Sequence, residues 1–487
     1  MKGLVIASNQ SGGGKTTVTL GLMRAFMNKG FKLQPYKVGP DYIDPAFHTK
    51  ITGIPCRNLD IYLMGEKGVK ASFSRGKGDL AIVEGVMGLY DGKGIDSKYS
   101  TAHVAKLLNL PVVLVISPKA QMATLCAEIN GLVNYDKVNI AGIILNNISE
   151  TYYKMLKLSI EHNCSTKVFG YVPKEDKLRI GSRHLGLVQS SEIKDIEDKI
   201  NLCSSLIEKH VDLESLVKVM EPSRDYEDKF HIENLIPGFS KGEKKKNLNI
   251  AVAYDKAFSF YYKENLELME ELSNVTYFSP LKEKKIPENT DFLYLGGGYP
   301  EVFAEDLSCN KSMLKSIRDN LNKGLYCYAE CGGLQYLTEA LVKDYKEEDI
   351  DYIKKAIRDL KSERSLNLED YIKNSDNIKE FVGFFKGFSY MTSRLQNFGY
   401  AKAVVKEENQ IAKALETINC HEFHRSKVLL DEKTIYKVEK NTVFGDKKSW
   451  KCGYIKKNTL GAYAHIHFFG NMKFLKLLQI RNNVLHI

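Results

Sequence analysis

The sequence predicts an α/β protein of two domains, each built on a parallel sheet. Apolar runs typical of buried strands alternate with helical stretches in the first part of the chain and again after residue 248. A stretch rich in lysine, proline and glycine separates the two alternations. A chain of 487 residues also exceeds what one core usually supports. We therefore predict a domain over residues 1–235, a linker over 236–248 and a second domain over 249–487.

Six apolar runs bounded by turn residues predict the strands of the first domain. They are rich in valine, isoleucine and leucine, as expected for parallel strands that helical crossovers bury on both faces. The first run fits a buried strand better than the apolar core of a signal peptide, because it is too short. The predicted strands are 2–8, 33–39, 79–85, 111–117, 140–147 and 167–173.

A glycine-rich turn follows the first predicted strand and opens a helix, in the stretch ASNQSGGGKTTVTL (7–20). It departs from the pattern G-x-x-x-x-G-K-[ST], since Asn9 stands where the first glycine belongs. The N–H groups of such a turn cradle phosphate oxygens, Lys15 would reach the outer phosphates, and Thr16 would offer its hydroxyl to Mg²⁺. The alternative is a flexible turn without a ligand. We predict a nucleotide site formed by Gly12, Gly13, Gly14, Lys15 and Thr16.

Acidic residues follow two further strands of the same domain. KVGPDYIDPAFH (37–48) places Asp41 and Asp44 after one strand, and IVEGVMGLYDG (82–92) brings Glu84 and Asp91 to the end of another. Ligands of open α/β sheets bind beyond the carboxyl ends of the strands, so these acids should converge beside the phosphate loop and can hold Mg²⁺ there. The alternative is turn and capping chemistry, which suits aspartate in GPD and YDG.

The second domain repeats the alternation. Predicted strands cover 248–254, 275–280 and 291–298, and predicted helices lie near 260–273 and 310–323. Residues 341–380 are highly charged with helical spacing. This pattern predicts an exposed helical insertion whose charged face meets solvent.

The stretch YAECGGLQYL (328–337) places Cys331 at a turn between a predicted strand and a predicted helix. Glycines on its carboxyl side tolerate a strained turn, and the helix N-terminus favours a thiolate, which together indicate a nucleophile elbow. The alternative is a buried cysteine packed under a helix. Late in the chain, GAYAHIHFFG (461–470) offers His465 and His467 on a predicted strand, both on one face, so that one can serve as the base.

Two further features belong to this second site. The glycine turn of DFLYLGGGYPE (291–301) follows a strand, and its N–H groups, with that of Gly332, can form an oxyanion hole. The stretch CHEFHRS (420–426) contains His421 and His424, but no spacing of cysteines or acids completes a zinc site. We therefore assign no zinc.

Composition limits the classes of protein that remain. The nine cysteines are scattered without a CxxC pair, which argues against zinc ribbons and disulfide scaffolds and favours a reducing cytoplasm. No apolar run approaches the length of a membrane span, and no basic stripe indicates nucleic acid. The net charge of +10 suits an anionic substrate or simply a lysine-rich surface.

Taken together, these motifs resemble the cobyrinate a,c-diamide synthase family. The resemblance runs in order over nearly the whole chain except residues 341–380. It is carried by SNQSGGGKTTV, KVGPDYIDPAFH, VEGVMGLYDG, LGGGYPE, YAECGGLQYL, MTSRLQNFGY, HEFHRS and AYAHIHF. It implies an amino-terminal, dethiobiotin-synthetase-like ATP domain and a carboxy-terminal class I glutamine amidotransferase domain of flavodoxin-like fold.

The resemblance also implies roles for individual residues. Cys331 would attack glutamine with His465 as base and acid, while His467 stands where most class I glutaminases have a glutamate, which leaves the third member of the triad open. Gly297, Gly298 and Gly332 would form the oxyanion hole. ATP would contact Gly12, Gly13, Gly14, Lys15, Thr16, Thr17 and Asn146, with Asn146 and Asn147 near adenine. Thr16 and Glu84 would hold Mg²⁺, and the substrate carboxylate and metal would be placed by Asp41, Tyr42, Asp44, Glu84 and Asp91.

Several readings stay open at this stage. The expected reaction is amidation of the a and c carboxylates of cobyrinate in cobalamin biosynthesis, with ATP, Mg²⁺ and L-glutamine. Hydrogenobyrinate and nickel-sirohydrochlorin are alternative tetrapyrrole substrates, whereas GPDYIDP and HIHF argue against the related cobyric acid synthase. A nucleotide-switched binding protein is an alternative of another class, but it would not need Cys331. A cytoplasmic protein without a nucleic-acid or membrane partner is expected, and a homodimer is left open.

Overall fold

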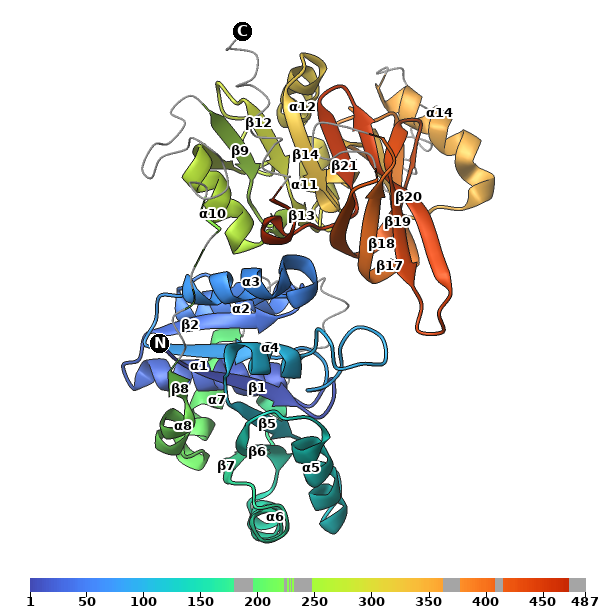
Figure 1. Ribbon diagram of the computed structural model, residues 1–487. Helices are drawn as coiled ribbons and strands as arrows, with labels where there is room; N and C mark the ends of the chain where they lie inside the picture. The colour runs from blue at the N-terminus through green and yellow to red at the C-terminus, as the bar shows by residue number, and fades with distance from the viewer. Residues whose placement is uncertain are drawn as a thin grey trace. The chain divides into compact units, whose positions relative to one another are not determined.

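The computed structural model describes residues 1–178, 196–222, 226, 228, 230–231, 248–361, 377–407 and 415–472. They belong to two compact units, Met1–Phe230 and His231–Ile487, which are described separately (Figure 1). The predicted linker over 236–248 lies outside the described residues except for residue 248.

The first unit contains a sheet whose main path is β3-β2-β4-β1-β5-β6-β7, with every neighbouring pair parallel. An additional short strand, β8, pairs antiparallel with the start of β1. This sheet confirms the predicted α/β class. Its strands are β1 (Lys2–Ser8), β2 (Leu33–Val38), β3 (Arg57–Leu59), β4 (Leu80–Glu84), β5 (Val112–Ile116), β6 (Ile140–Ile148), β7 (Val168–Pro173) and β8 (Glu221–Pro222).

Helices flank this sheet (Figure 1). One core joins β1 and β4 to α1 and α7 through buried side chains that include Ile6, Ile82, Phe26 and Ile207. Burial of such side chains contributes about 1.5–3 kcal/mol each. The core therefore holds α1 against the sheet and so fixes the position of the phosphate loop, which precedes α1. The helices are α1 (Lys15–Asn28), α2 (Ile43–Thr52), α3 (Ile61–Ser74), α4 (Thr101–Leu108), α5 (Ala123–Tyr135), α6 (Glu150–Asn163), α7 (Ile196–His210), α8 (Leu213–Val219) and the 3₁₀ turn η1 (Asp176–Leu178).

The second unit contains a larger mixed sheet of order β11-β9-β12-β14-β21-β20-β19-β17-β15-β16, to which β18 adds by pairing with β17. The first five strands are parallel and the following three neighbours are antiparallel. Its strands are β9 (Asn249–Ala253), β11 (Asn274–Phe278), β12 (Phe292–Leu295), β14 (Tyr326–Glu330), β15 (Ala340–Val342), β16 (Ile378–Glu380), β17 (Gly387–Val405), β18 (Thr417–Leu430), β19 (Lys433–Asn441), β20 (Lys447–Lys456) and β21 (Thr459–Ala462). A separate short pair joins β10 (Phe258–Phe260) to β13 (Gly297–Gly298).

Residues 341–380, predicted as an exposed helical insertion, also contain strands and buried side chains. The two ends of this segment belong to β15 and β16, which pair with each other, and the helix between them buries Ile353 and Ile357 against those strands. Residues 362–376 lie outside the described residues. The helices of this unit are α10 (Lys263–Leu272), α11 (Ala304–Cys309), α12 (Lys311–Asn322), α13 (Gly332–Leu337), α14 (Ile350–Lys361) and the 3₁₀ turns η3 (Glu347–Asp349) and η4 (Phe468–Gly470).

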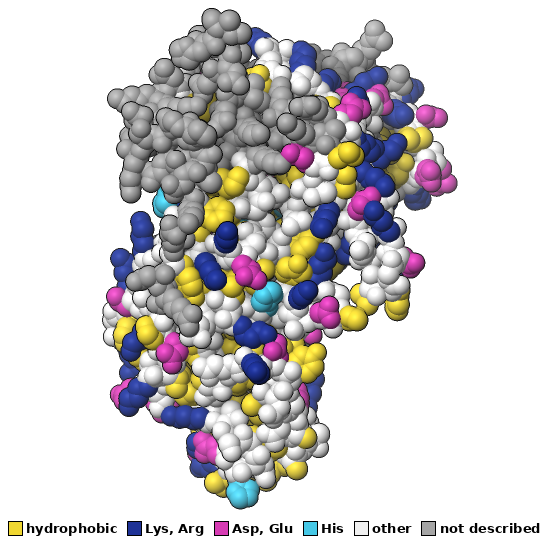
Figure 2. Space-filling model, in the orientation of Figure 1, with side chains coloured by type: hydrophobic (Ala, Val, Ile, Leu, Met, Phe, Trp, Pro, Cys, Tyr) yellow, Lys and Arg dark blue, Asp and Glu magenta, His cyan; other side chains and the backbone are white. Residues whose placement is uncertain are grey.

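On the face that Figure 2 shows, lysine and arginine side chains are interspersed with acidic and uncharged ones. Within the described ranges, every helix is too short or too polar to pass through a bilayer.

Candidate active sites

The phosphate loop joins β1 to α1 in a backbone conformation that needs glycine. Gly12 and Gly14 have φ angles of 76° and 86°, and Gly14 is the residue that precedes the first turn of α1. A Cβ atom at Gly14 would lie 2.1 Å from the side-chain nitrogen of Asn146. The loop therefore presents backbone N–H groups, not side chains, at the helix N-terminus, which is the arrangement that binds phosphate.

Lys15 reaches from the start of α1 to the loop that follows β4. Its Nζ donates to the Met87 carbonyl at 2.6 Å. Burial, and then the neighbouring charge of Lys37, lower the pKa of Lys15 to about 8, against the opposing charges of Glu84 and Asp91. Water screens a partly buried charge only weakly. The protonated form of Lys15 should therefore attract the phosphates of a nucleotide strongly.

Glu84 connects the loop to the strands beneath it. The register of β1 and β4 sets Ile6 opposite Glu84, and the carboxylate accepts from Thr16 Oγ1 at 2.6 Å and from Lys37 Nζ at 3.2 Å. Its second oxygen lies 2.6 Å from His48 Nε2. Burial alone would raise the pKa of Glu84, but the charge of Lys37 and the hydrogen bonds from His48 and Thr16 outweigh it and hold that pKa well below its usual range. Glu84 is therefore a carboxylate at neutral pH.

The other predicted acids take two kinds of position. Asp44 is buried and pairs with Lys37 Nζ at 2.8 Å. Asp41 is half-buried and accepts from the Ile43 N–H, and Tyr42 precedes the first residue of α2. Asp91 is exposed, and its carboxylate accepts from the Gly88 N–H at 2.9 Å. Asp44 thus shares the buried cluster of Glu84, whereas Asp41 and Asp91 keep turn contacts and remain accessible.

Sequence reasoning did not single out Lys37 and His48, although both stand in the motif that supplied Asp41 and Asp44. Lys37 bridges Asp44 and Glu84, and His48 is fully buried against Glu84 and Cys56. A lysine inside the predicted buried strand LQPYKV was the available signal, because a lysine is almost never buried unless it is paired.

Asn146, the predicted adenine contact, lies beside the phosphate loop. Its side chain packs against the phosphate loop, donating to Ser117 Oγ at 3.0 Å and to the Gly13 carbonyl at 3.3 Å. Ser117 Oγ also donates to the Gly13 carbonyl. Asn146 therefore braces the loop, and Asn147 beside it is exposed with φ of 60°.

The lowered pKa of Lys15 predicts that nucleotide binding weakens at high pH. Lys15 is charged below pH 8 and loses its charge as the pH rises through about 8. We expect the apparent Kd for ATP, measured by calorimetry, to rise by about tenfold between pH 7 and pH 9. Lys15→Arg is the matched control, since a guanidinium stays protonated in this range and should flatten the profile. A wild-type Kd that is constant over this range would contradict the assignment.

The second unit places Cys331 at a strained turn. Cys331 lies between β14 and α13 with φ of 48° and ψ of −96°, and only 4% of its surface is exposed. Its N–H donates to the Ala462 carbonyl at 2.7 Å, which ties the turn to the end of β21. A non-glycine residue with positive φ costs about 1–3 kcal/mol and is typical of a nucleophile elbow.

The surroundings of Cys331 favour the thiol form, which opposes the effect expected from a helix N-terminus. Burial raises the pKa of Cys331 well above its usual value, and the carboxylates of Glu301, Glu422 and Glu330 raise it further, while a hydrogen bond from the Gly332 N–H opposes the shift. The following helix has six residues, so its dipole is weak. A thiol acts as a nucleophile only when a base removes its proton.

The predicted oxyanion glycines lie beside this turn. A Cβ atom at Gly332 would lie 3.1 Å from the Gly298 backbone nitrogen, and one at Gly297 would lie 2.5 Å from Cε1 of His465. The two glycines of β13 therefore approach Gly332 on one side and the imidazole of His465 on the other. Backbone N–H groups close to the nucleophile are what a tetrahedral oxyanion requires.

His465 and His467 do not share one strand face as predicted. The chain leaves β21 at Ala462, and His465 then forms an isolated bridge with His421. His465 Nδ1 lies 3.6 Å from Glu330 Oε2, whereas His467 Nε2 lies 3.4 Å from Glu264 Oε2. The two histidines therefore face different acids, and His465 is the one beside the glycine turn.

The histidines of β18 also pack near this site. The His421 ring stacks on the His465 ring at 4.9 Å, and its Nε2 lies 2.8 Å from the Tyr262 hydroxyl. Burial, and then the charge of His465, lower the pKa of His421 well below its usual value. His424 pairs with Glu422 at 3.1 Å. His421 therefore packs directly on His465, whereas His424 stacks on Tyr463.

The close approach of Gly297 to His465 gives a direct test. Gly297→Ala would push the imidazole aside, and we expect the kcat for glutamine hydrolysis to fall by about 100-fold, because a displacement of this size misaligns the base. Gly131→Ala in α5 is the matched control, since nothing lies within 4 Å of its added methyl group. Equal activity of the two variants, measured by glutamate release, would contradict this geometry.

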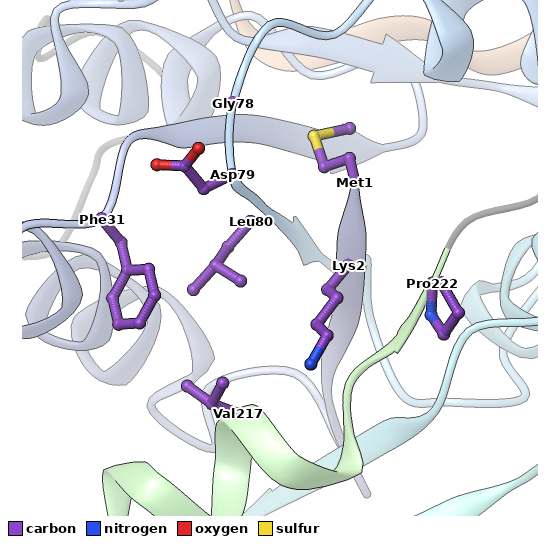
Figure 3. Close-up of a pocket in the computed structure, with 8 residues that line it drawn as sticks. All are labelled: Met1, Lys2, Phe31, Gly78, Asp79, Leu80, Val217 and Pro222. Carbon is purple, nitrogen blue, oxygen red and sulfur yellow. The ribbon is translucent and has the colours of Figure 1, made fainter.

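A pocket of about 500 Å³ in the first unit lies away from these groups (Figure 3). Lys2 and Leu80, the first residues of β1 and β4, line it together with Val217 and Pro222. It therefore opens at the amino ends of the strands, whereas the phosphate loop follows their carboxyl ends. Ligands of open α/β sheets bind at the carboxyl edge, so this pocket is not the nucleotide site.

Comparisons with known proteins agree with this division into two sites. Residues 4–188 match the profile of the CobQ/CobB/MinD/ParA nucleotide binding domain, and residues 249–473 match that of the CobB/CobQ-like glutamine amidotransferase domain. The first match contains the phosphate loop and Glu84. The second contains Cys331 and His465.

Relatives match the chain over nearly its whole length. The cobyrinate a,c-diamide synthase of Clostridium tetani is 62% identical over 478 residues, which cover 98% of this chain and 99% of the relative. The enzyme of that name from Clostridium acetobutylicum is 55% identical over 98% of this chain and 100% of the relative. That of Caldanaerobacter subterraneus subsp. tengcongensis is 40% identical over 96% of this chain and 95% of the relative. The resemblance is confirmed: the chain belongs to the cobyrinate a,c-diamide synthase family, with an amino-terminal nucleotide-binding domain and a carboxy-terminal glutamine amidotransferase domain.

Proposed function

We propose that the chain converts the a and c side-chain carboxylates of cobyrinate to amides, with glutamine as nitrogen donor and ATP as the activating nucleotide. The observation that carries the proposal is the presence, in one chain, of an elbow cysteine and a histidine that both adjoin the Gly297–Gly298 segment, and of a phosphate loop beside buried acids. The names of the near full-length relatives favour cobyrinate over the alternative tetrapyrroles. A nucleotide-switched binding protein would need neither Cys331 nor the glycine turns around it.

The glutaminase half begins with attack of the Cys331 sulfur on the amide carbon of glutamine. The thiol proton passes to His465, and the N–H groups of the glycine turns at Gly298 and Gly332 stabilise the oxyanion. Collapse of this intermediate breaks the C–N bond as His465 returns the proton to nitrogen. Ammonia leaves, and water then hydrolyses the thioester to glutamate and the free thiol.

The synthetase half uses ATP to make a carboxylate reactive. A carboxylate oxygen of the substrate attacks the γ-phosphorus, ADP leaves, and an acyl phosphate forms. Ammonia attacks the acyl carbon, and the phosphate leaves with the oxygen that came from the carboxylate. Lys15 and the loop glycines neutralise and orient the phosphates, which is the main work of a protein in phosphoryl transfer.

The residues beside the loop fit Mg²⁺. Thr16 and Glu84 offer a hydroxyl and a carboxylate joined at 2.6 Å, and such hard oxygen donors suit this ion. Among the described residues, no group of three or more His, Cys, Asp or Glu side chains is arranged to hold a metal ion. Thr16 and Glu84 would therefore share the ion with ATP phosphates and water. When bound, Mg²⁺ neutralises charge on the phosphates.

The accessible acids are proposed to position the substrate. Asp41, Tyr42 and Asp91 lie on the loops that follow β2 and β4, while Asp44 and Glu84 anchor Lys37 beneath them. Lys37 would then offer a buried positive charge near the substrate carboxylate and the ATP phosphates.

We propose a cytoplasmic location as well, since a reducing compartment keeps Cys331 as a thiol.

Product analysis tests the proposal. The chain is incubated with ATP, Mg²⁺ and glutamine and with each of three macrocycles, namely cobyrinate, hydrogenobyrinate and nickel-sirohydrochlorin. We expect two successive acid-to-amide mass changes on cobyrinate, at the a and c positions. Amidation of another macrocycle in preference to cobyrinate would reject the substrate, and amidation of none would reject the reaction.

A further inference from the structure

We propose that Glu330, the residue directly before the nucleophile, is the carboxylate that orients His465. This inference rests on the proposed glutaminase role of Cys331 and His465. It fills the place in the triad that the H-x-H sequence leaves open, because His467 cannot act as a negatively charged partner.

The distances place Glu330 behind the imidazole. Its Oε2 lies 3.6 Å from His465 Nδ1, and both side chains are at least 98% buried. The opposite edge of the ring, with Cε1 and Nε2, faces Gly297 in the turn beside Cys331. A separation of 3.6 Å is an ion-pair distance, not a hydrogen bond, and catalytic contacts commonly tighten when substrate binds.

Other groups hold the Glu330 carboxylate in place. It accepts from the Tyr328 hydroxyl at 2.8 Å, from the Tyr294 hydroxyl at 3.1 Å and from the Ile466 N–H at 3.3 Å. Burial, and then the charge of Glu330, raise the pKa of both tyrosines well above their usual value, so both hydroxyls remain donors. A carboxylate with these partners cannot turn away from His465 without leaving three donors unsatisfied.

The backbone couples the acid, the nucleophile and the base. Glu330 pairs with Ala462 in the register of β14 and β21, and the Cys331 N–H donates to the Ala462 carbonyl. His465 follows three residues later and exchanges two backbone hydrogen bonds with His421, at 2.9 Å and 3.2 Å. The junction of β14 and β21 therefore sets Glu330 and Cys331, and the hydrogen bonds to β18 set His465, so all three groups are fixed by strands.

Two other buried acids of this unit, Glu264 and Glu422, lie against other groups. Glu264 lies 3.4 Å from His467 Nε2, and His467 Nδ1 accepts from the Phe469 N–H. Glu422 accepts from Trp450 and pairs with His424. The residue at the usual glutamate position thus belongs to a second histidine–carboxylate pair, which provides an internal control.

The chemical role follows from the two ends of the ring. With its Nδ1 proton directed at Glu330, His465 keeps an Nε2 lone pair on the side of the glycine turn, where it can accept the thiol proton. The carboxylate then stabilises the imidazolium that forms, as the aspartate does in serine hydrolases. Glu330 is a positioning residue, since it acts through His465.

Glutamine hydrolysis by the full chain tests this role. Glu330→Gln removes the charge but keeps the shape, and we expect the kcat for glutamate release to fall at least about 100-fold with KM changed less than about threefold. Glu330→Asp should restore part of the rate. Glu264→Gln, the matched change in the second pair, should stay within about fivefold of wild type. Amidation with added ammonium chloride should persist in all three variants and reports that they are folded.

Each outcome decides between separate claims. A Glu330→Gln protein that keeps ammonia-dependent amidation and a kcat within threefold of wild type overturns the role of Glu330, as does a larger loss in Glu264→Gln. Absence of glutamine hydrolysis in wild type would instead reject the proposed function. If Glu330→Gln does not fold, ¹⁵N shifts of labelled wild type, assigned against His465→Ala, decide the point. We expect the neutral ring to carry its proton on Nδ1, and a proton on Nε2 would overturn the inference.

Discussion

Replacing Cys331 by serine is expected to abolish glutamine-dependent amidation while leaving amidation with added ammonia. A serine hydroxyl is a far weaker nucleophile than the sulfur that the elbow presents to glutamine, and we expect glutamate release to fall at least about 10³-fold. The synthetase half does not use the sulfur, so ammonium chloride should bypass the defect. Glutamate and amide products are measured in the same reactions.

The matched control is Cys327→Ala in the same strand. Cys327 is also buried, but it lies within β14 and not at the turn that follows the strand. This variant should therefore keep both activities. Loss of the ammonia-dependent reaction in folded Cys331→Ser protein would contradict the separation of two half-reactions.

Replacing Lys15 by alanine is expected to remove amidation from either nitrogen source. Lys15 stands at the first position of α1 beside Glu84, and its charge is the one that would meet the transferring phosphate. Loss of one such charge typically reduces turnover by about 10²–10³-fold. Glutamate release, which needs no ATP chemistry, should persist at a measurable rate.

Lys29→Ala tests whether this effect is specific. Lys29 follows the last residue of the same helix and is exposed, so its removal should leave both reactions near wild type. A Lys15→Ala protein that keeps ammonia-dependent amidation would place phosphoryl transfer elsewhere.

The parts of the fold that the sequence predicted are those with strong local signals. Apolar runs between turn residues located the six strands predicted for the first unit to within two residues, because strands buried on both faces have little freedom of composition. The phosphate loop and the Cys331 elbow were also local, since their residues adjoin in the chain. The short β3, with arginine and asparagine among its three residues, carried no such signal.

The parts that sequence reasoning missed depend on contacts between distant segments. Glu330 and His465 are 135 positions apart, and the register of β14 and β21 brings them together. Similarly, Lys37 acquires its role from Glu84 and Asp44 on other elements. The long hairpin of β17 and β18 was not predicted either, because its half-buried pattern includes polar residues on both faces.

The transfer of oxygen from the substrate carboxylate to phosphate tests the central claim most directly. Cobyrinate labelled with ¹⁸O in its carboxylates is converted with ATP and glutamine, and the released phosphate is analysed by mass spectrometry. An acyl phosphate intermediate predicts one ¹⁸O atom in the phosphate for each amide formed. Unlabelled phosphate, or label recovered in AMP, would contradict activation of the acid by the γ-phosphate at the loop around Lys15.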